Sequence, residues 1–202
     1  VRCPELVEGF KFPTKNPSIK SIRSREDLAK FYSALPDVRS KAIFLMLASS
    51  GLRRGEVLSL HLQDVDFTKR MLAPKCHEGN TKRSWISFYN AEAQEVLDQF
   101  LKVRWKHSDK LFPITKPDFE KAWRTARQTA NVNVKPKDLR DWFADEMGRL
   151  GVQDRYIDAF QGRTPKSVLA RHYSDYSPEK LQAIYEKAQL KILASEILVP
   201  AL

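Results

Sequence analysis

Residues 137–151 read KDLRDWFADEMGRLG, an amphipathic stretch from which the rest of the chain can be interpreted. Two cations, Lys137 and Arg140, lie three residues apart on one face near the expected helix start. A helix N-terminus flanked by cations suits a phosphate group, although a solvated basic edge is the simpler interpretation of this helix alone. The apolar residues recur at spacings of three and four, which predicts an α-helix with one buried face: Leu139, Trp142, Phe143, Met147 and Leu150.

The sequence on either side predicts more helices, interrupted by one short β region. Strand-like runs at residues 64–67, 70–74 and 83–89 are bounded by turn residues, and Gly79-Asn80 marks a loop tip. We therefore expect a mainly α fold with a small three-stranded antiparallel sheet. Capping signals and helical periodicity predict helices over residues 24–35, 38–51, 55–62, 91–105, 118–130, 152–162 and 177–198.

The chain divides into three parts. Residues 1–23 contain three prolines and scattered charges, and are expected to form an N-terminal arm or linker. Residues 24–193 are expected to form one domain, and residues 194–202 a C-terminal tail. Because the chain does not begin with methionine, we interpret it as a fragment of a longer protein. The apolar end of the chain suits docking on a neighbouring subunit or on its own domain, and the sequence does not separate these two alternatives.

The charge of the chain points to a polyanionic partner. There are 35 Lys and Arg residues against 25 Asp and Glu, a formal net charge of +10, which favours nucleic acid or an anionic membrane over a neutral ligand. A generically basic soluble protein is the alternative. No apolar run approaches the roughly 20 residues of a membrane-spanning helix, and no secretory signal is evident.

Cysteine usage favours a reducing, cytoplasmic environment and no metal site. Only two cysteines occur, Cys3 and Cys76, too few for a disulfide framework. Cys76 and His77 are adjacent, but no second pair stands at zinc-site spacing. We therefore expect no metal in the protein.

Several segments, taken in chain order, resemble the signature motifs of the tyrosine recombinases, which comprise the phage-type integrases and Xer-like recombinases. Residues 48–60, ASSGLRRGEVLSL, resemble the first motif, with Arg53 directly after Gly-Leu and Glu56 three residues later. The second motif of the family opens with His or Lys, has Arg three residues on, and continues through an aromatic-rich helix to a glycine. The residues that match it are Lys137, Arg140, Trp142, Phe143 and Gly151.

The remaining motifs follow in the family's order. Residues 160–175, FQGRTPKSVLARHYSD, place Arg163 at the family's third-motif histidine and Tyr173 at its nucleophilic tyrosine. A β-hairpin in the family presents a lysine, and here residues 77–85 supply Lys82. Lys137 and Arg163 replace the commoner histidines, as in integrases of archaeal viruses and plasmids. The general base is thereby left open, because arginine does not give up a proton near neutral pH.

The resemblance implies a role for each matching residue. Tyr173 would attack a DNA phosphate and form a 3′-phosphotyrosyl bond. The neighbouring His172 would either support this reaction or pack locally, and local packing is the simpler role. Lys82 would protonate the departing 5′ oxygen, with Lys75 in the same hairpin as its rival. Glu56 cannot bind phosphate, but it can hold an arginine in place. The phosphate itself would be bound by four cations: Arg53, Arg140, Arg163 and Lys137.

Alternative assignments remain at this stage. Tyr176 is the rival of Tyr173 but is expected to pack, because it immediately precedes Ser177-Pro178, the expected start of the last helix. Arg54 is expected either to contact the DNA backbone or to be solvated. The basic residues at 102–110 and 121–128 suit helices that contact DNA phosphates, and the tryptophans within them are expected in the core.

The resemblance implies a site-specific DNA recombinase or integrase that needs neither a metal nor a nucleotide cofactor. Its expected partners are double-stranded DNA and copies of itself, as a tetramer on DNA and a dimer or monomer when free. The family usually has a separate DNA-clamping domain before this one. A type IB topoisomerase, which shares the chemistry, and a non-catalytic DNA-binding domain are the alternative functions.

Overall fold

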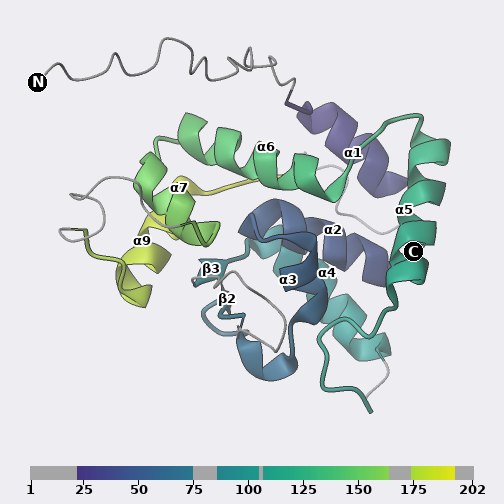
Figure 1. The fold of residues 1–202 in the computed structure, drawn as a ribbon, viewed down its shortest axis with the longest axis horizontal. Helices are drawn as coiled ribbons and strands as arrows, with labels where there is room; N and C mark the ends of the chain where they lie inside the picture. Colours follow the sequence, from purple (N-terminus) through teal and green to yellow (C-terminus); the bar gives the residue numbers. More distant parts are fainter. Residues whose placement is uncertain (1–21, 75–85, 105–106, 164–173, 194–202) are drawn as a thin grey trace, which may run out of the picture.

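The computed structural model describes residues 22–74, 86–104, 107–163 and 174–193. Helices dominate these ranges, and one small sheet lies among them (Figure 1). The strands are β1 (Val65–Asp66), β2 (Met71–Leu72) and β3 (Ser87–Phe88), paired antiparallel in the order β1-β2-β3. The predicted fold class is therefore confirmed. The helices are α1 (Arg25–Ser33), α2 (Val38–Ser50), α3 (Arg54–Ser59), the 3-10 turn η1 (Leu62–Asp64), α4 (Ala91–Val103), α5 (Lys116–Ala130), α6 (Pro136–Arg149), α7 (Asp154–Phe160) and α9 (Pro178–Ala188).

Helix α2 is the central element of the fold. Asp37 caps its start by accepting a 2.7 Å hydrogen bond from the Ser40 amide. Every residue from Ala42 to Ser50 is buried, and helices α3, α4, α5 and α6 all contact α2, which lies among them in Figure 1. Because α2 is apolar nearly all round, it must be covered on every side, and this requirement places the other helices.

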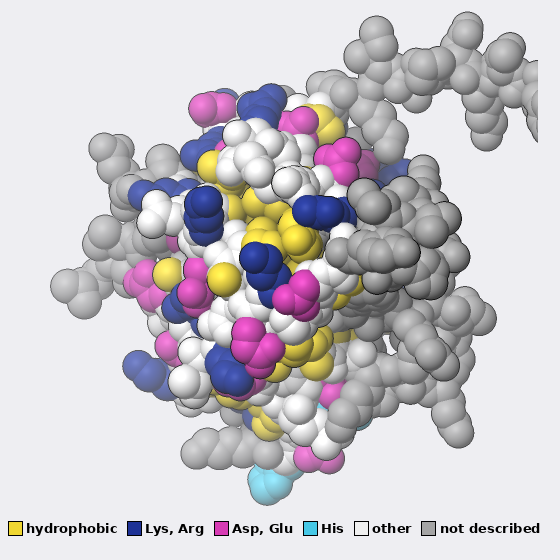
Figure 2. Space-filling model, turned by 90° about the vertical axis from the view of Figure 1, so that its left-hand side faces the viewer, with side chains coloured by type: hydrophobic (Ala, Val, Ile, Leu, Met, Phe, Trp, Pro, Cys, Tyr) yellow, Lys and Arg dark blue, Asp and Glu magenta, His cyan; other side chains and the backbone are white. Residues whose placement is uncertain are grey.

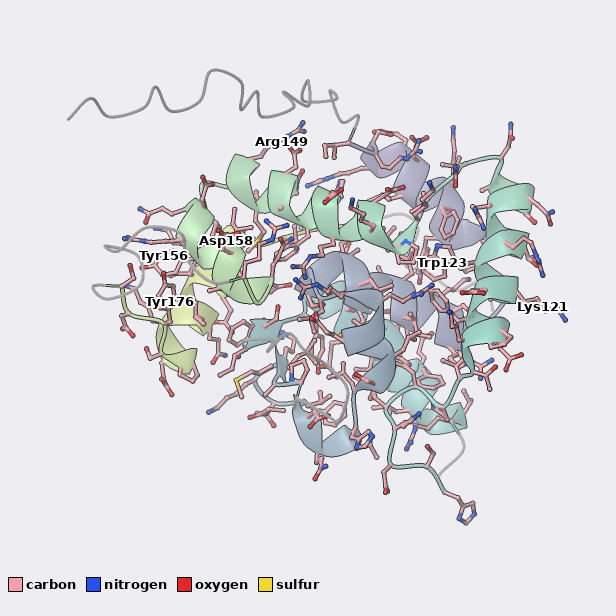
Figure 3. The ribbon with its side chains drawn as sticks, viewed as in Figure 1. Lys121, Trp123, Arg149, Tyr156, Asp158 and Tyr176 are labelled. Carbon is pink, nitrogen blue, oxygen red and sulfur yellow. The ribbon has the colours of Figure 1, made fainter. Side chains whose placement is uncertain are left out.

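Aromatic rings join α1 and α5 to α2. The Trp123 ring of α5 lies 5.3 Å from Phe31 of α1 and 6.2 Å from Phe44 of α2, measured between ring centroids. Trp123 is buried, and its indole N–H donates to the Val134 carbonyl at 3.0 Å, so the expectation that this tryptophan belongs to the core is confirmed. On the same helix Lys121 points outward to solvent (Figure 3).

The sheet depends on the helices for its stability, because each strand pairs over only two residues. The side chain of Phe88 in β3 packs against Phe160 of α7 and Tyr185 of α9, with centroid distances of 6.1 and 5.6 Å. Phe88 is 1% exposed. The strands are therefore held by side-chain packing against α7 and α9 more than by their own backbone ladder.

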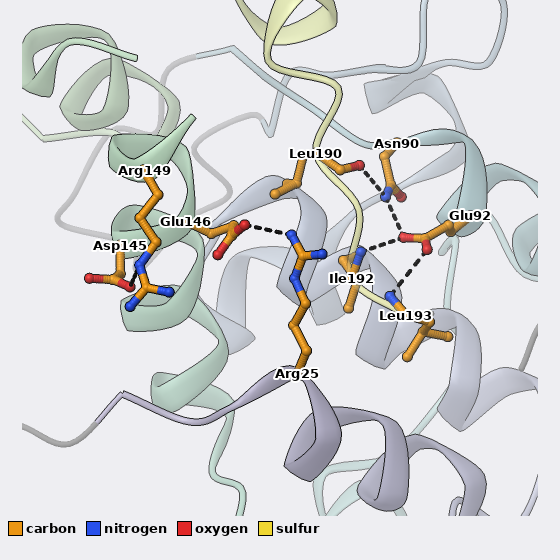
Figure 4. A network of polar contacts seen from close by, with 9 residues as sticks. All are labelled: Arg25, Asn90, Glu92, Asp145, Glu146, Arg149, Leu190, Ile192 and Leu193. Carbon is orange, nitrogen blue, oxygen red and sulfur yellow. Dashed lines mark hydrogen bonds and ion pairs between the residues drawn. The ribbon is translucent and has the colours of Figure 1, made fainter. Parts of the chain in front are cut away.

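The last helix is shorter than the sequence predicted. It ends at Ala188, and Gln189 adopts the left-handed conformation with φ of 48°. Beyond it the Glu92 carboxylate accepts hydrogen bonds from the backbone amides of Ile192 and Leu193, at 2.7 and 3.1 Å (Figure 4). Hydrogen bonds to this carboxylate take the place of helical hydrogen bonds, and the apolar side chains beyond Gln189 are buried without a helix. The helical periodicity of the sequence therefore predicted too long a helix.

Helix α6 also departs from its predicted pattern at one position. Four of its five predicted apolar residues are buried, but Leu150 is 39% exposed. Leu150 lies at the C-cap, and Gly151 turns the chain away with φ of 81°, so the helical face has ended there. Helix α6 is also joined to α1, because Arg25 donates to Glu146 at 2.5 Å (Figure 4).

No helix in the described part of the chain is both long and apolar enough to cross a membrane.

Replacing Gly51 by alanine tests the packing at the end of α2. Gly51 has φ of 65°, and a Cβ built on it would collide with the ring of Phe143 in α6. We expect Gly51→Ala to lower the free energy of unfolding by roughly 2–4 kcal/mol, through the left-handed backbone and the clash. Urea denaturation measures this change.

The matched control is Gly55→Ala in α3. Gly55 has an ordinary φ, and no atom lies within 4 Å of the position its Cβ would occupy. Its free energy of unfolding should be unchanged or slightly higher. Equal losses in the two variants would contradict the packing argument.

Candidate active site

The carboxyl end of α2 is the framework of the candidate site. Helix C-termini leave carbonyl oxygens without a partner in the helix, and here these oxygens are buried away from water. Three consecutive carbonyls each accept a hydrogen bond from a side chain distant in sequence: Ser49 from the Tyr185 hydroxyl at 2.8 Å, Ser50 from the Ser87 hydroxyl at 2.6 Å, and Gly51 from Arg140 Nη1 at 2.6 Å.

Arg140 is buried, with 7% of its surface exposed. Its Nη2 donates to the Gln161 carbonyl at 2.7 Å, and Gln161 Nε2 donates back to the Arg140 carbonyl at 2.8 Å. The interpretation of this helix edge as merely solvated is therefore wrong for Arg140. Two carbonyls hold the guanidinium in place without neutralising it, and no carboxylate forms an ion pair with it among the residues described.

The electrostatic environment of Arg140 shows that other cations lie near it. The pKa of Arg140 is lowered to about 10, mainly by burial and also by the positive charges of Arg53 and Arg163, while the negative charge of Glu56 partly opposes this shift. Arg140 remains charged at neutral pH. Three arginines from α3, α6 and the end of α7 therefore act on one another, which makes the region attractive to an anion.

Arg53 and Glu56 form the predicted pair. The Arg53 amide donates to Glu56 Oε2 and its Nη1 donates to Glu56 Oε1, both at 2.7 Å. Arg53 is the N-cap of α3 and Glu56 is the third residue of the helix. Glu56 is 8% exposed, whereas the Arg53 side chain is 34% exposed. A buried carboxylate thus fixes the start of α3 and the direction of a partly exposed guanidinium.

Arg163 follows α7 and is the most exposed of the three arginines. Its Nη1 lies 3.2 Å from Asp158 Oδ1, and its amide donates to the Asp158 carbonyl at 2.8 Å. The side chain is 47% exposed. Gly162, with φ of 62°, turns the chain between α7 and Arg163. The positive charge of Arg163 lowers the pKa of Arg140, as that of Arg53 does, so the three arginines influence one another electrostatically.

Other predicted residues have different placements. Lys137 is exposed on the first turn of α6, three residues before the buried Arg140 of the same helix. Tyr176 packs edge-to-face on Tyr156 at 6.0 Å, in agreement with its predicted packing role. Four predicted site residues lie outside the described part of the chain: Lys75, Lys82, His172 and Tyr173. Cys76 and His77 lie outside it as well.

The structure adds contacts that the sequence did not indicate. Gln161, which is fully buried, holds Arg140, although no motif marked it. The Arg54 side chain is 39% exposed, its Nη1 lies 3.5 Å from Glu120, and its guanidinium lies over the Phe119 ring; whether it contacts DNA stays a prediction. Both partners lie far away in sequence, so no local pattern reveals them. Within the described residues no three His, Cys, Asp or Glu side chains are grouped as metal ligands would be.

The surface around α7 and α9 has mixed charge. In Figure 2, which views the molecule from this side, the described Lys and Arg side chains alternate with Asp and Glu around exposed apolar atoms. The described part of this face is therefore not uniformly basic, and the mutual influence of Arg53, Arg140 and Arg163 is a local feature.

Comparisons with known proteins identify the family and the fold of the chain. The tyrosine recombinase XerA of Pyrococcus horikoshii is 28% identical over 199 residues, covering 91% of this chain and 67% of that protein. XerA of Thermococcus onnurineus is 29% identical over 202 residues, covering 92% of this chain and 69% of that protein. The chain thus spans about two thirds of the length of these relatives.

Two solved structures share the fold. A crystal structure of XerA recombinase has a TM-score of 0.60 at 23% identity, covering 89% of this chain and 68% of that one. The integrase from mycobacterium phage Brujita has a TM-score of 0.64 at 18% identity, covering 94% and 66%. The sequence matches the phage integrase family over residues 24–180, which is most of the chain. The chain therefore belongs to the phage integrase family, the family of the tyrosine recombinases.

Proposed function

We propose that residues 24–193 are the catalytic domain of a site-specific recombinase, which cleaves and rejoins double-stranded DNA through a covalent 3′-phosphotyrosyl intermediate. The observation that best supports this proposal is the buried Arg140, held by two carbonyls and electrostatically coupled to Arg53 and Arg163. A phosphodiester in the transition state carries more negative charge than in the ground state. Fixed cations aimed at its oxygens therefore lower the barrier.

In the proposed reaction the phenolic oxygen of Tyr173 attacks the phosphorus. A bond forms between phosphorus and the phenolic oxygen, and the bond from phosphorus to the 5′ oxygen of the DNA breaks. The phenol gives up its proton to water as the new bond forms, and Lys82 donates a proton to the departing 5′ oxygen. Attack by a 5′ hydroxyl reverses these steps and rejoins a strand, so the energy of the phosphodiester bond is conserved.

The arginines would have distinct roles. Arg140 is already desolvated and oriented, so it needs little rearrangement when the phosphate arrives. The Arg53 side chain is paired with Glu56 and is partly exposed, so it would be available to a phosphate oxygen. Arg163 would exchange its exposed contact with Asp158 for a phosphate oxygen. Lys137, on the first turn of α6, would contact the DNA from outside this group.

The surface of α5 is a candidate contact for the DNA backbone. Arg124, Arg127, Gln128, Asn131 and Asn133 line an open cavity of about 470 Å³ at its C-terminal end. Arginine and amide side chains suit phosphate and sugar oxygens. We propose that this surface contacts the backbone of the duplex, and that the protein acts on DNA as a tetramer, as the resemblance to the tyrosine recombinases implies.

Trapping on a suicide substrate tests the nucleophile. A nicked duplex that loses its 5′ fragment should leave the wild-type chain covalently bound, and Tyr173→Phe should abolish this product because the attacking oxygen is gone. Tyr176→Phe, which keeps the packing ring, should largely preserve it. Denaturing gel electrophoresis measures the adduct. An adduct that persists in Tyr173→Phe but is lost in Tyr176→Phe would contradict the assignment. In a separate assay, relaxation of supercoiled DNA without recombinant product would favour a type IB topoisomerase.

Replacing Arg140 separates catalysis from docking. Arg140→Lys keeps the positive charge but loses the planar fork that spans two carbonyls and a phosphate. We expect the single-turnover cleavage rate to fall on the order of a hundredfold, with DNA affinity little changed. Arg149→Ala, an exposed position at the far end of α6, is the control. A parallel loss of binding and cleavage would make Arg140 a docking residue.

The proton donor can be identified with a modified leaving group. Lys82→Ala should cleave ordinary DNA slowly, because the 5′ alkoxide departs without a proton. A 5′-thio substrate should restore its rate, since a thiolate needs no protonation. The same substrate should not rescue Arg140→Lys. Failure to rescue Lys82→Ala would point to Lys75 or to another role.

A further inference from the structure

Helix α7 contacts both the arginine cluster and the chain next to the proposed nucleophile. At its C-terminal end, Gln161 holds Arg140, and Arg163 follows two residues later. At its N-terminal end, Arg155 and Tyr156 contact residues 174–176, which directly follow Tyr173 in the sequence. One short helix therefore lies between the cations and the segment that continues from residue 173.

The contacts at the N-terminal end involve both charge and packing. The Tyr156 ring lies edge-to-face on Tyr176 at 6.0 Å, and the two rings are adjacent in Figure 3. The guanidinium of Arg155 lies 4.9 Å from the centre of the Tyr156 ring. Its Nη1 reaches the Ser174 hydroxyl at 3.4 Å. Tyr156 is 9% exposed, so this contact belongs to the packed part of the molecule.

The segment after Tyr173 is also ordered by its own turn. The Asp175 carboxylate accepts a 2.8 Å hydrogen bond from the Ser177 amide. Ser177 in turn caps α9, its hydroxyl accepting from the Lys180 amide. Residues 174–177 are therefore fixed on one side by α7 and on the other by the start of α9.

Helix α7 is itself fixed to the core. Phe160 at its end is fully buried and packs edge-to-face against Phe143 of α6 at 6.4 Å and Tyr185 of α9 at 5.8 Å. The same Tyr185 donates to the Ser49 carbonyl at the end of α2. The helix cannot shift relative to Arg140 without disturbing these contacts.

We propose that Arg155 and Tyr156 are positioning residues for the nucleophile. By holding Ser174 and Tyr176 on α7, they set where the chain leaves residue 173 relative to Arg140 and Arg163. Neither residue touches the reacting atoms. The inference rests on the proposed function of Tyr173, because it concerns the placement of that residue.

Truncation of the two rings tests the proposal. We expect Tyr156→Ala and Tyr176→Ala to slow single-turnover formation of the covalent adduct by about a hundredfold, since small misplacements of a reacting group have effects of this size. The affinity for the same duplex should change by less than about threefold, because the arginines are untouched. Tyr156→Phe and Tyr176→Phe keep the ring packing and should cleave at near the wild-type rate. Arg155→Met should give a smaller loss.

A matched control separates positioning from general destabilisation. Tyr32 in α1 is 5% exposed and packs on Phe44 at 5.8 Å, on a helix that carries none of the site residues. Tyr32→Ala removes a ring of the same size and should leave the adduct-forming rate unchanged at temperatures where the variant is folded. Melting curves of all variants fix that temperature.

The outcomes for the two proposals can be told apart. If the wild type forms no adduct, or if Tyr173→Phe does, the proposed function fails. If the wild type and Tyr173→Phe behave as expected but Tyr156→Ala and Tyr176→Ala cleave at the wild-type rate, the positioning role alone is wrong. A loss of cleavage that is matched by an equal loss of DNA affinity, or by an equal loss in Tyr32→Ala, would also overturn it.

Discussion

The carboxyl end of α2 is buried, so its carbonyl oxygens need donors that water cannot supply. Leaving one such oxygen unpaired would cost roughly 1–3 kcal/mol. Three side chains, one each from β3, α6 and α9, donate hydrogen bonds to these oxygens. These donors bring elements up to 136 residues apart in sequence to one point. One of the three donors is Arg140, so the requirement that closes the core also fixes a cation where three elements meet.

This arrangement explains how a charged group can be buried with no ion pair to any residue that the structure describes. The carbonyls of Gly51 and Gln161 accept hydrogen bonds from Arg140 but do not neutralise its charge. Its lowered pKa reflects that burial and the nearby positive charges of Arg53 and Arg163. Under the proposed function, a phosphate bound beside these cations would offset their mutual repulsion, and the offset would be largest in the more negatively charged transition state.

Local patterns predicted much of the fold, and motif resemblance predicted the site. The cap at Ser24 and the end of α2 at Gly51 lie where expected, because capping depends on residues within one turn. The Arg53–Glu56 pair was equally predictable from its spacing. The end of α9 was not predictable, because backbone amides beyond it donate to the Glu92 carboxylate and the apolar side chains there are buried. The contacts of Gln161 with Arg140 and of Glu120 with Arg54 were not predictable either, because each joins residues far apart in the sequence.

By itself the sequence determined the mainly helical fold class, the family and the candidate residues, because periodicity, capping and motif spacing are properties of neighbours along the chain. Only the tertiary structure decided that Arg140 points inward to Gly51 and Gln161, whereas Lys137, three residues earlier, stays exposed. Both cations look alike in an amphipathic pattern. They differ because only the side of α6 that carries Arg140 faces the buried end of α2. There Arg140 donates to the Gly51 carbonyl, which would otherwise lack a hydrogen-bond donor.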